Sequence, residues 1–264
     1  MSKKNLDKTL SYLEKKEKIL FLLTSNRWSG HKDDIPKSSQ LAYDLQQRLG
    51  PNKVKIVDVT KLMIYECEGN VSSKTGNHCG IKEALLKNGK DKTGQLRCWA
   101  SFNNKDDELY KIVNELLDSD SVIFFGSIRW GKMNAVYAKL VERLTWIENR
   151  HTTYGEKNIV EDIDVGVISV GHNWNGEEAI QHEKEVLKFF GFKTPKDLFW
   201  SYQWTKDKYD ESKKGYDQDI KDFAKEFFQM IKESVMKFVD YLRTHHHPKR
   251  APQQTRITQQ QVRK

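Results

Sequence analysis

Apolar residues follow two patterns along the chain, and these patterns predict strands and helices in turn. Short continuous or alternating apolar runs are typical of parallel strands, and they lie at 19–23, 54–59, 121–125, 164–170 and near 197–201. Apolar residues at helical spacing separate them, at 41–49, 109–117, 133–147 and 177–190. Strands that alternate with helices predict an α/β fold with a doubly wound, five-stranded parallel sheet.

Two more helices are predicted near the ends of the chain. Residues 4–16 place leucines on one stripe, and residues 220–242 carry a longer stripe of apolar side chains. The last segment, 245–264, is polar and basic, and we expect it to be disordered. We therefore divide the chain into an N-terminal helix (1–17), one domain (18–244) and a basic tail (245–264).

The segment 60–102 is irregular and interrupted by glycines. A stretch of that length inside a compact domain is typical of a functional or disordered insertion. On either side of it, two helix starts are predicted from capping residues. Ser38 is expected to cap the helix that ends at Gly50, and Asn103-Asn104 to cap a helix whose first turn carries three acidic residues, Asp106 to Glu108.

Composition narrows the choice of partners. The net charge is +8, from 45 Lys and Arg against 37 Asp and Glu, which suits a Lys-rich surface or attraction of an anionic cofactor. No recognition motif accompanies the charge, so we expect no specific nucleic-acid partner. No apolar run approaches the ~20 residues that span a bilayer, and the Lys-rich start lacks a secretory apolar region. We expect a cytoplasmic protein without a membrane partner.

Three loops follow predicted strands and would meet at one edge of the sheet, where open α/β sheets bind ligands. The first runs from Thr24 to Ser39 and ends at a helix N-terminus, a place suited to a phosphate group. The second, 127–131, carries an aromatic residue before a glycine. The third, 171–176, encloses a His-Asn-Trp cluster between two glycines.

The second loop and its helix resemble a known family, the flavodoxin-like NAD(P)H-dependent FMN reductases and quinone reductases. The residues that match are Ser127, Trp130, Gly131, Lys139, Glu142 and Arg143. In that family the segment forms one wall of the flavin site. This chain has Ile128-Arg129-Trp130 where the family usually has Pro-x-Tyr or Pro-x-Trp. The first loop resembles the family's Gly-Ser-x-Arg pattern, with Thr24 in place of the glycine.

The resemblance implies a strand order of 2-1-3-4-5 and an FMN site at the switch point between strands 1 and 3. It makes 18–244 an FMN-binding domain. The phosphate would be bound by Ser25, Arg27, Ser38 and Ser39. The ring would be bound by Ser127, Ile128, Arg129, Trp130 and Gly131, and by Gly171, His172, Asn173 and Trp174, with His172 a substrate contact. No side chain is expected to act as a proton-transfer catalyst, because flavin N5 carries the chemistry.

The function that the resemblance implies is an FMN-dependent oxidoreductase. It would transfer a hydride from NAD(P)H through the flavin to a quinone or a similar small acceptor, and it would form a homodimer or a larger homo-oligomer. Two alternatives stay open: an electron-transfer protein of the flavodoxin type, and a relative of the iron–sulfur flavoproteins.

The iron–sulfur alternative depends on three cysteines of the insertion, Cys67, Cys79 and Cys98. Their odd number does not suggest a disulfide framework. Their separations of 12 and 19 residues match no compact cluster spacing, and a cluster usually takes four thiolates. His78 could complete a zinc site, but it is adjacent to Cys79, which makes the geometry awkward. We predict plain thiols and no metal site, with a redox pair as the other alternative.

Overall fold

The computed structural model describes residues 2–26, 35–70, 78–171, 175–203 and 236–237. The chain forms two compact units, Met1–Phe223 and Ala224–Lys264. In the second unit the described residues are Met236 and Lys237, which are helical. The rest of the predicted helix 220–242, and the tail 245–264, lie outside the described residues.

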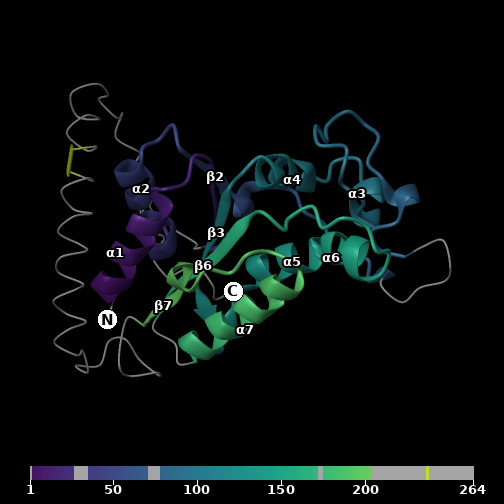
Figure 1. Cartoon of the computed structure of the whole chain (residues 1–264). Helices are drawn as coiled ribbons and strands as arrows, with labels where there is room; N and C mark the ends of the chain where they lie inside the picture. The colour runs from purple at the N-terminus through teal and green to yellow at the C-terminus, as the bar shows by residue number, and fades with distance from the viewer. Residues whose placement is uncertain (1, 27–34, 71–77, 172–174, 204–235, 238–264) are drawn as a thin grey trace, which may run out of the picture. The chain divides into compact units, whose positions relative to one another are not determined.

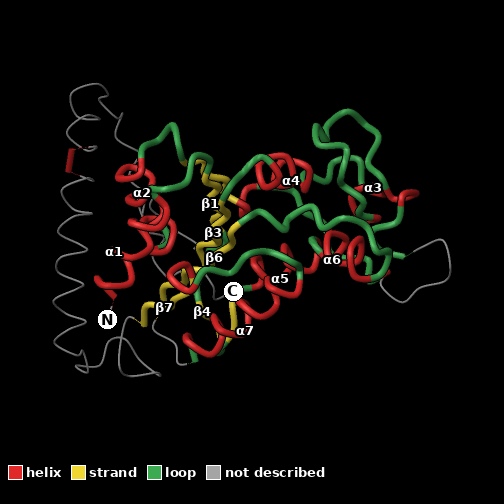
Figure 2. The backbone as a smooth tube through the Cα atoms, in the orientation of Figure 1, coloured by secondary structure: helices red, strands yellow, loops and turns green. Residues whose placement is uncertain are grey.

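The first unit contains a five-stranded parallel sheet (Figures 1 and 2). Its order is β2-β1-β3-β6-β7. The strands are β1 (Ile19–Leu23), β2 (Val54–Asp58), β3 (Ser121–Gly126), β6 (Asp164–Gly171) and β7 (Phe199–Gln203). Since β6 and β7 are the fourth and fifth strands of this sheet, the predicted order 2-1-3-4-5 is confirmed.

Burial explains why the strands read as continuous apolar runs. Every residue of β1 and β3 is buried, and β6 is buried up to its last residue. Helices cover both faces of such a sheet, so alternation between apolar and polar positions is lost. Strand β2 lies at the edge, and there Lys55 is exposed.

The helices lie on opposite sides of the sheet in Figure 1. Helices α1 (Ser2–Leu13) and α2 (Lys37–Leu49) lie on one side. The other side holds α4 (Leu109–Leu117), α5 (Ala135–Arg143), α6 (Thr145–Thr152) and α7 (Gly176–Phe189). This two-layer cover is the doubly wound arrangement that the sequence predicts.

Side chains of helix α1 form hydrogen bonds with β6, with β7 and with the segment just before β7. The hydroxyl of Thr9 donates to the carbonyl of Asp197 at 2.6 Å and accepts from Trp200 Nε1 at 2.9 Å. The Tyr12 hydroxyl donates to the carboxylate of Asp164, the first residue of β6, at 2.7 Å. Helix α1 is therefore packed against the domain that it precedes in the sequence.

The insertion is more ordered than its glycines suggest. Its described residues include the short helices η1 (Val59–Lys61), η3 (Lys82–Ala84) and α3 (Trp99–Asn103). The predicted cap at Asn103-Asn104 is wrong, because these residues end α3, and α4 begins at Leu109. The acidic residues that precede α4 are not in its first turn. One of them, Asp107, forms an ion pair with α5 that is described below.

Candidate functional site

The switch point lies where the carboxyl ends of β1 and β3 meet. From β1 the chain crosses to β2 on one side, and β3 pairs with β1 on the other. The first residue after β1, Thr24, continues the pairing: its N–H and its hydroxyl both donate to the carbonyl of Phe125, at 2.9 and 3.0 Å. The loops after β1 and β3 therefore start side by side, as a ligand site at this edge requires.

The first loop forms a small cradle of buried hydroxyl groups. Ser25, Ser38 and Ser39 are all buried, and the Ser38 hydroxyl donates to Ser25 Oγ at 2.9 Å. The prediction that Ser38 caps α2 is wrong. The helix begins at Lys37 after Pro36, which makes no side-chain cap hydrogen bond. The Ser38 hydroxyl bonds to Ser25 instead. Both serines therefore lie at a helix N-terminus, a place that suits an anion.

The predicted Arg27 lies outside the described residues.

The second loop is a β-hairpin that the sequence analysis did not foresee. Strands β4 (Ile128–Arg129) and β5 (Lys132–Met133) pair antiparallel around a two-residue turn. Both turn residues have positive φ, 51° at Trp130 and 71° at Gly131. This is the pattern of the type I′ turn, which favours Asn-Gly. The signal was the glycine in the second turn position, but a tryptophan in the first concealed it.

Trp130 stands at the tip of this hairpin with 88% of its surface exposed. A bulky side chain at positive φ is uncommon, and such conformations cluster at functional sites. Packing against the described residues does not compensate for the strain, because the ring is almost fully exposed. Trp130 is therefore not part of the described core. Arg129 is also exposed, whereas Ile128 is buried.

Two glycines of the third loop lie close to the hairpin or to β7. Gly171 ends β6, and a side chain there would approach the backbone of Ile128 to 3.5 Å. A side chain at Gly176 would come within 2.5 Å of Ser201 Oγ, so the Ser201 side chain would have to shift. The predicted ring contacts His172, Asn173 and Trp174 lie outside the described residues.

Two asparagines that the sequence analysis missed connect the three loops. Asn134 is buried and caps α5, its Oδ1 accepting from the N–H of Tyr137 at 3.1 Å. Its Nδ2 lies 3.4 Å from Thr24 Oγ1 and 3.5 Å from Ser127 Oγ. Asn175 reaches from the third loop to the hairpin. The preference of Asn for helix N-caps was the signal available for Asn134.

The described members of the predicted site thus gather at neighbouring strand ends. Ser25 follows β1, and Ser38 and Ser39 belong to the helix that this loop enters. Ser127 and the hairpin follow β3, and Gly171 ends β6. Because β1, β3 and β6 are adjacent in the sheet, all these residues lie where the carboxyl ends of these strands meet.

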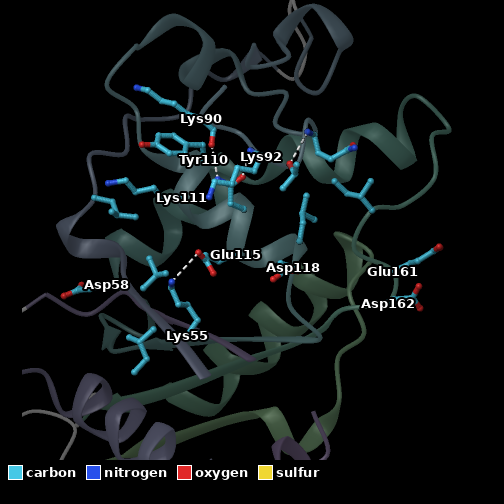
Figure 3. A pocket seen from close by; sticks show the side chains of 18 of the residues that line it. Lys55, Asp58, Lys90, Lys92, Tyr110, Lys111, Glu115, Asp118, Glu161 and Asp162 are labelled. Carbon is cyan, nitrogen blue, oxygen red and sulfur yellow. Dashed lines mark hydrogen bonds and ion pairs between the residues drawn. The ribbon is translucent and has the colours of Figure 1, made fainter. Parts of the chain in front are cut away.

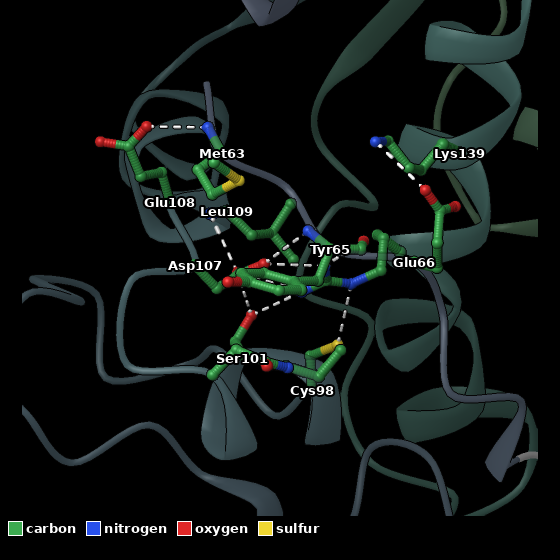
Figure 4. A network of polar contacts seen from close by, with 12 residues as sticks. Met63, Tyr65, Glu66, Cys98, Ser101, Asp107, Glu108, Leu109 and Lys139 are labelled. Atoms are coloured by element: carbon green, nitrogen blue, oxygen red, sulfur yellow. Dashed lines mark hydrogen bonds and ion pairs between the residues drawn. The ribbon is translucent and has the colours of Figure 1, made fainter. Parts of the chain in front are cut away.

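Arg143, which matches the resembling family's flavin wall, contacts the insertion in this chain. Figure 4 labels its partners Tyr65, Cys98, Ser101 and Asp107. Its guanidinium is completely buried and bonds both oxygens of the buried Asp107 carboxylate, at 2.9 and 3.0 Å. It also donates to Ser101 Oγ at 2.8 Å, to the carbonyl of Tyr65 at 2.6 Å and to Cys98 Sγ at 3.4 Å. Arg143 therefore fastens the insertion to α5.

Asp107 is held as a carboxylate by this network. Burial alone would raise its pKa, but hydrogen bonds and charge from Arg143 lower it. Further hydrogen bonds from the Ser101 hydroxyl and the Tyr65 N–H act in the same direction. The outcome is a pKa below the ordinary value of an aspartate.

The cysteines lie in or near the same part of the insertion. Cys79 and Cys98 are buried and Cys67 is half-buried. Among the residues that the structure describes, no three His, Cys, Asp or Glu side chains are grouped to hold a metal ion. Burial raises the pKa of the Cys79 thiol to about 12, and the neighbouring Cys98 and Cys67 add to the rise.

Cys79 is consequently expected to resist alkylation. At pH 8 its thiol is neutral, and the thiolate is the nucleophile. Iodoacetamide should label the half-buried Cys67 first in the native protein and Cys79 only after unfolding, as peptide mass spectrometry would show. Equal labelling rates for the two native thiols would contradict the assignment of Cys79 as an inert core residue.

A groove of about 1150 Å³ lies beside β2 and α4 (Figure 3). It is lined by β2, α4 and parts of the insertion, together with residues 157–162. Its charges are mixed and largely paired, as between Lys55 and Glu115 at 3.6 Å. None of the predicted site residues lines it, so it is not the predicted ligand site.

Comparison with known proteins gives matches among solved structures only. No family model and no curated protein matches the chain. The structure of RosB with the bound intermediate 8-demethyl-8-formylriboflavin-5'-phosphate is 12% identical, covers 94% of each chain and has a TM-score of 0.50. A flavone reductase, at 12% identity, covers 71% of this chain and 54% of its own with a TM-score of 0.44. An azoreductase from Bacillus anthracis str. Sterne, at 15% identity, covers 83% and 97% with a TM-score of 0.42.

Within the described residues, no helix is both long and apolar enough to cross a membrane. The sheet order and the helices on its two faces agree with the match to RosB over nearly the whole chain. The chain therefore has the flavodoxin-like α/β fold.

Proposed function

We propose that this protein is an FMN-dependent oxidoreductase that transfers a hydride from NAD(P)H, through the flavin, to a quinone or a similar small acceptor. The observation that carries the proposal is the buried serine cradle at the start of α2, at the switch point. A flavin phosphate bound by a protein of the same fold, RosB, supports the choice of ligand.

The cradle suits the phosphate of FMN. Ser25 Oγ accepts a hydrogen bond from the Ser38 hydroxyl. The hydrogen of the Ser25 hydroxyl is therefore available for donation to a phosphate oxygen. The first-turn N–H groups of α2 and the positive end of the helix dipole add to the attraction. Arg27, outside the described residues, would contribute a guanidinium charge.

The hairpin suits the edge of the flavin ring. Gly131 has no side chain to obstruct a flat ring, and the hairpin's N–H groups would donate to the ring's polar edge. Trp130 would lie against the ring or its substrate, and Arg129 would stabilise negative charge on the reduced ring. When bound, FMN supplies the hydride acceptor N5 and the route of electrons to the second substrate. The chain's residues bind and orient it.

The third loop completes the proposal on the strength of the resemblance. His172, Asn173 and Trp174 would contact the ring, and His172 would also meet the substrate. A homodimer or larger homo-oligomer and a cytoplasmic location belong to the proposal on the same basis.

The visible absorption spectrum tests the proposal most directly. Purified protein incubated with FMN and then desalted should retain the two bands of oxidised flavin, and NAD(P)H should bleach them under nitrogen. A quinone should restore them. Protein that emerges colourless from this treatment would rule out flavin binding. Broad additional absorption would favour the iron–sulfur alternative.

Trp130→Ala separates a ring contact from a structural residue. Because the side chain is 88% exposed and the backbone strained, we expect the apo-protein's free energy of unfolding to change by no more than ~0.5 kcal/mol. Flavin affinity should fall by ~0.5–1.5 kcal/mol, the value of an aromatic pair. Denaturant unfolding and FMN titration measure the two quantities. Unchanged affinity for flavin and unchanged turnover would remove Trp130 from the site.

A further inference from the structure

Asn175 occupies an N-cap position but does not cap its own helix. It precedes α7, makes no side-chain cap hydrogen bond, and has the left-handed backbone conformation, with φ at 66°. An asparagine at an N-cap ordinarily uses its side-chain oxygen to accept from the first turn. Here the side-chain nitrogen donates instead to the carbonyl of Gly131, at 3.0 Å.

The acceptor of this bond is the turn of the hairpin. Each of its strands has only two residues, and a short hairpin has little stability of its own. Its two turn residues both have positive φ, and Trp130 is so exposed that packing against the described residues does not hold it there. A hydrogen bond from the third loop therefore reaches the part of the hairpin that its own contacts support least.

We propose that Asn175 is a positioning residue of the flavin reaction. Its amide holds the Trp130-Gly131 turn at a fixed place beside the ring, so that the aromatic side chain and the hairpin's N–H groups face the flavin. The inference rests on the proposed function and extends it to a residue outside the ring-contact set. Loss of the Asn175 bond is expected to change how the flavin ring is held and not how the phosphate is held. Asn175 bonds the hairpin, whereas the phosphate would be held by the serine cradle.

The chain contains a matched control at the other end of α7. The side-chain amide of Asn158 donates to the carbonyl of Gly191, which follows α7, at 2.9 Å. It is the same kind of bond, from an asparagine amide to a glycine carbonyl, but it lies at the opposite edge of the sheet. Asn175→Gly removes the amide and keeps the backbone free to adopt positive φ. Asn158→Gly removes the equivalent amide far from the flavin.

The experiment compares the full-length wild type with both variants. We expect Asn175→Gly to lower the rate of flavin reduction at saturating FMN by about tenfold, because a misplaced reacting group slows the chemical step. Affinities for FMN and riboflavin should fall together, by about three- to tenfold, so that their ratio is unchanged. Asn158→Gly should leave the rate and both affinities at wild-type values, whatever it does to the melting temperature.

A second variant, Asn175→Asp, keeps the size of the side chain and replaces the donor by a carboxylate that faces the Gly131 carbonyl. It should reduce the rate at least as much as Asn175→Gly. Wild-type reduction rates and affinities in both Asn175 variants would overturn the positioning role. So would a loss confined to the melting temperature, as expected of Asn158→Gly. A wild type that binds no flavin would contradict the proposed function, and with it the role of Asn175. A wild type that binds flavin but is unaffected by the Asn175 variants would contradict only the role of Asn175.

Discussion

Replacing Asp107 by alanine is expected to lower the free energy of unfolding by about 3–5 kcal/mol, because the change leaves Arg143 buried without its counter-charge. Both side chains are completely buried. The guanidinium would keep its bonds to Ser101 and Tyr65, but these carry no negative charge. Urea unfolding of the apo-protein at pH 7, followed by circular dichroism, measures the loss.

Asp106→Ala is the matched control. Its carboxylate is exposed and bonds the Tyr65 hydroxyl, so the expected change is within ~0.5 kcal/mol. A double variant, Asp107→Leu with Arg143→Met, should recover most of the stability, since replacing a buried pair by apolar residues is often neutral. An Asp107→Ala protein as stable as the control would show that the insertion is not held to α5 by this pair.

The same pair gives the stability a defined dependence on pH. The pKa of Asp107 is lowered in the folded state, so the folded protein binds this proton less readily than the unfolded chain. Its contribution is present above the unfolded pKa of ~3.9 and is lost as the pH falls through the folded value. The difference in free energy of unfolding between wild type and Asp107→Ala should accordingly become smaller below about pH 4.

Joint replacement of Ser25 and Ser38 by alanine is expected to weaken FMN binding by about 1.5–3 kcal/mol, the contribution of the one hydrogen bond that the Ser25 hydroxyl would donate to the charged phosphate. Riboflavin, which lacks the phosphate, should bind as before. Stability should change little, because the two hydroxyls bond each other, and removing both partners leaves no unpaired group. Titration of the apo-protein with each flavin gives the two affinities.

A similar serine pair supplies the control. Ser169 of β6 donates its hydroxyl to Ser201 of β7 at 2.8 Å. Replacing this pair by alanine should leave the ratio of FMN to riboflavin affinity unchanged. Equal losses for FMN and riboflavin in the Ser25 and Ser38 variant would mean that the phosphate is bound elsewhere.

The sheet was predictable because burial on both faces leaves a strong mark in the sequence. The fully buried β1 and β3 read as unbroken apolar runs, and nothing else in the chain competes with that pattern. Helix starts were less predictable, because a capping residue and a tertiary partner have the same polar character. Ser38 resembles an N-cap but bonds Ser25, and Asp107 resembles a first-turn acid but pairs with Arg143.

Within the site, the sequence indicated which loops matter but not how they are held. The serines could be named from their place after β1 and at the start of α2. The hairpin was missed because Trp130 disguises the turn, and Asn175 because the bond to Gly131 joins residues 44 positions apart. Contacts of that kind depend on loop geometry, on which the periodicity of apolar residues has no bearing.

The attachment of α1 to the far strands has a consequence for the newly made chain. Thr9 bonds Asp197 and Trp200, which are 188 and 191 positions later. At a synthesis rate of ~5–20 residues per second, the helix would wait about 10–40 s before its partners exist. During that time Leu6 and Leu13, which are buried in the folded protein, would be exposed and accessible to chaperones. Helix α1 would therefore dock only after the partners of Thr9, 188 and 191 positions later, had been made.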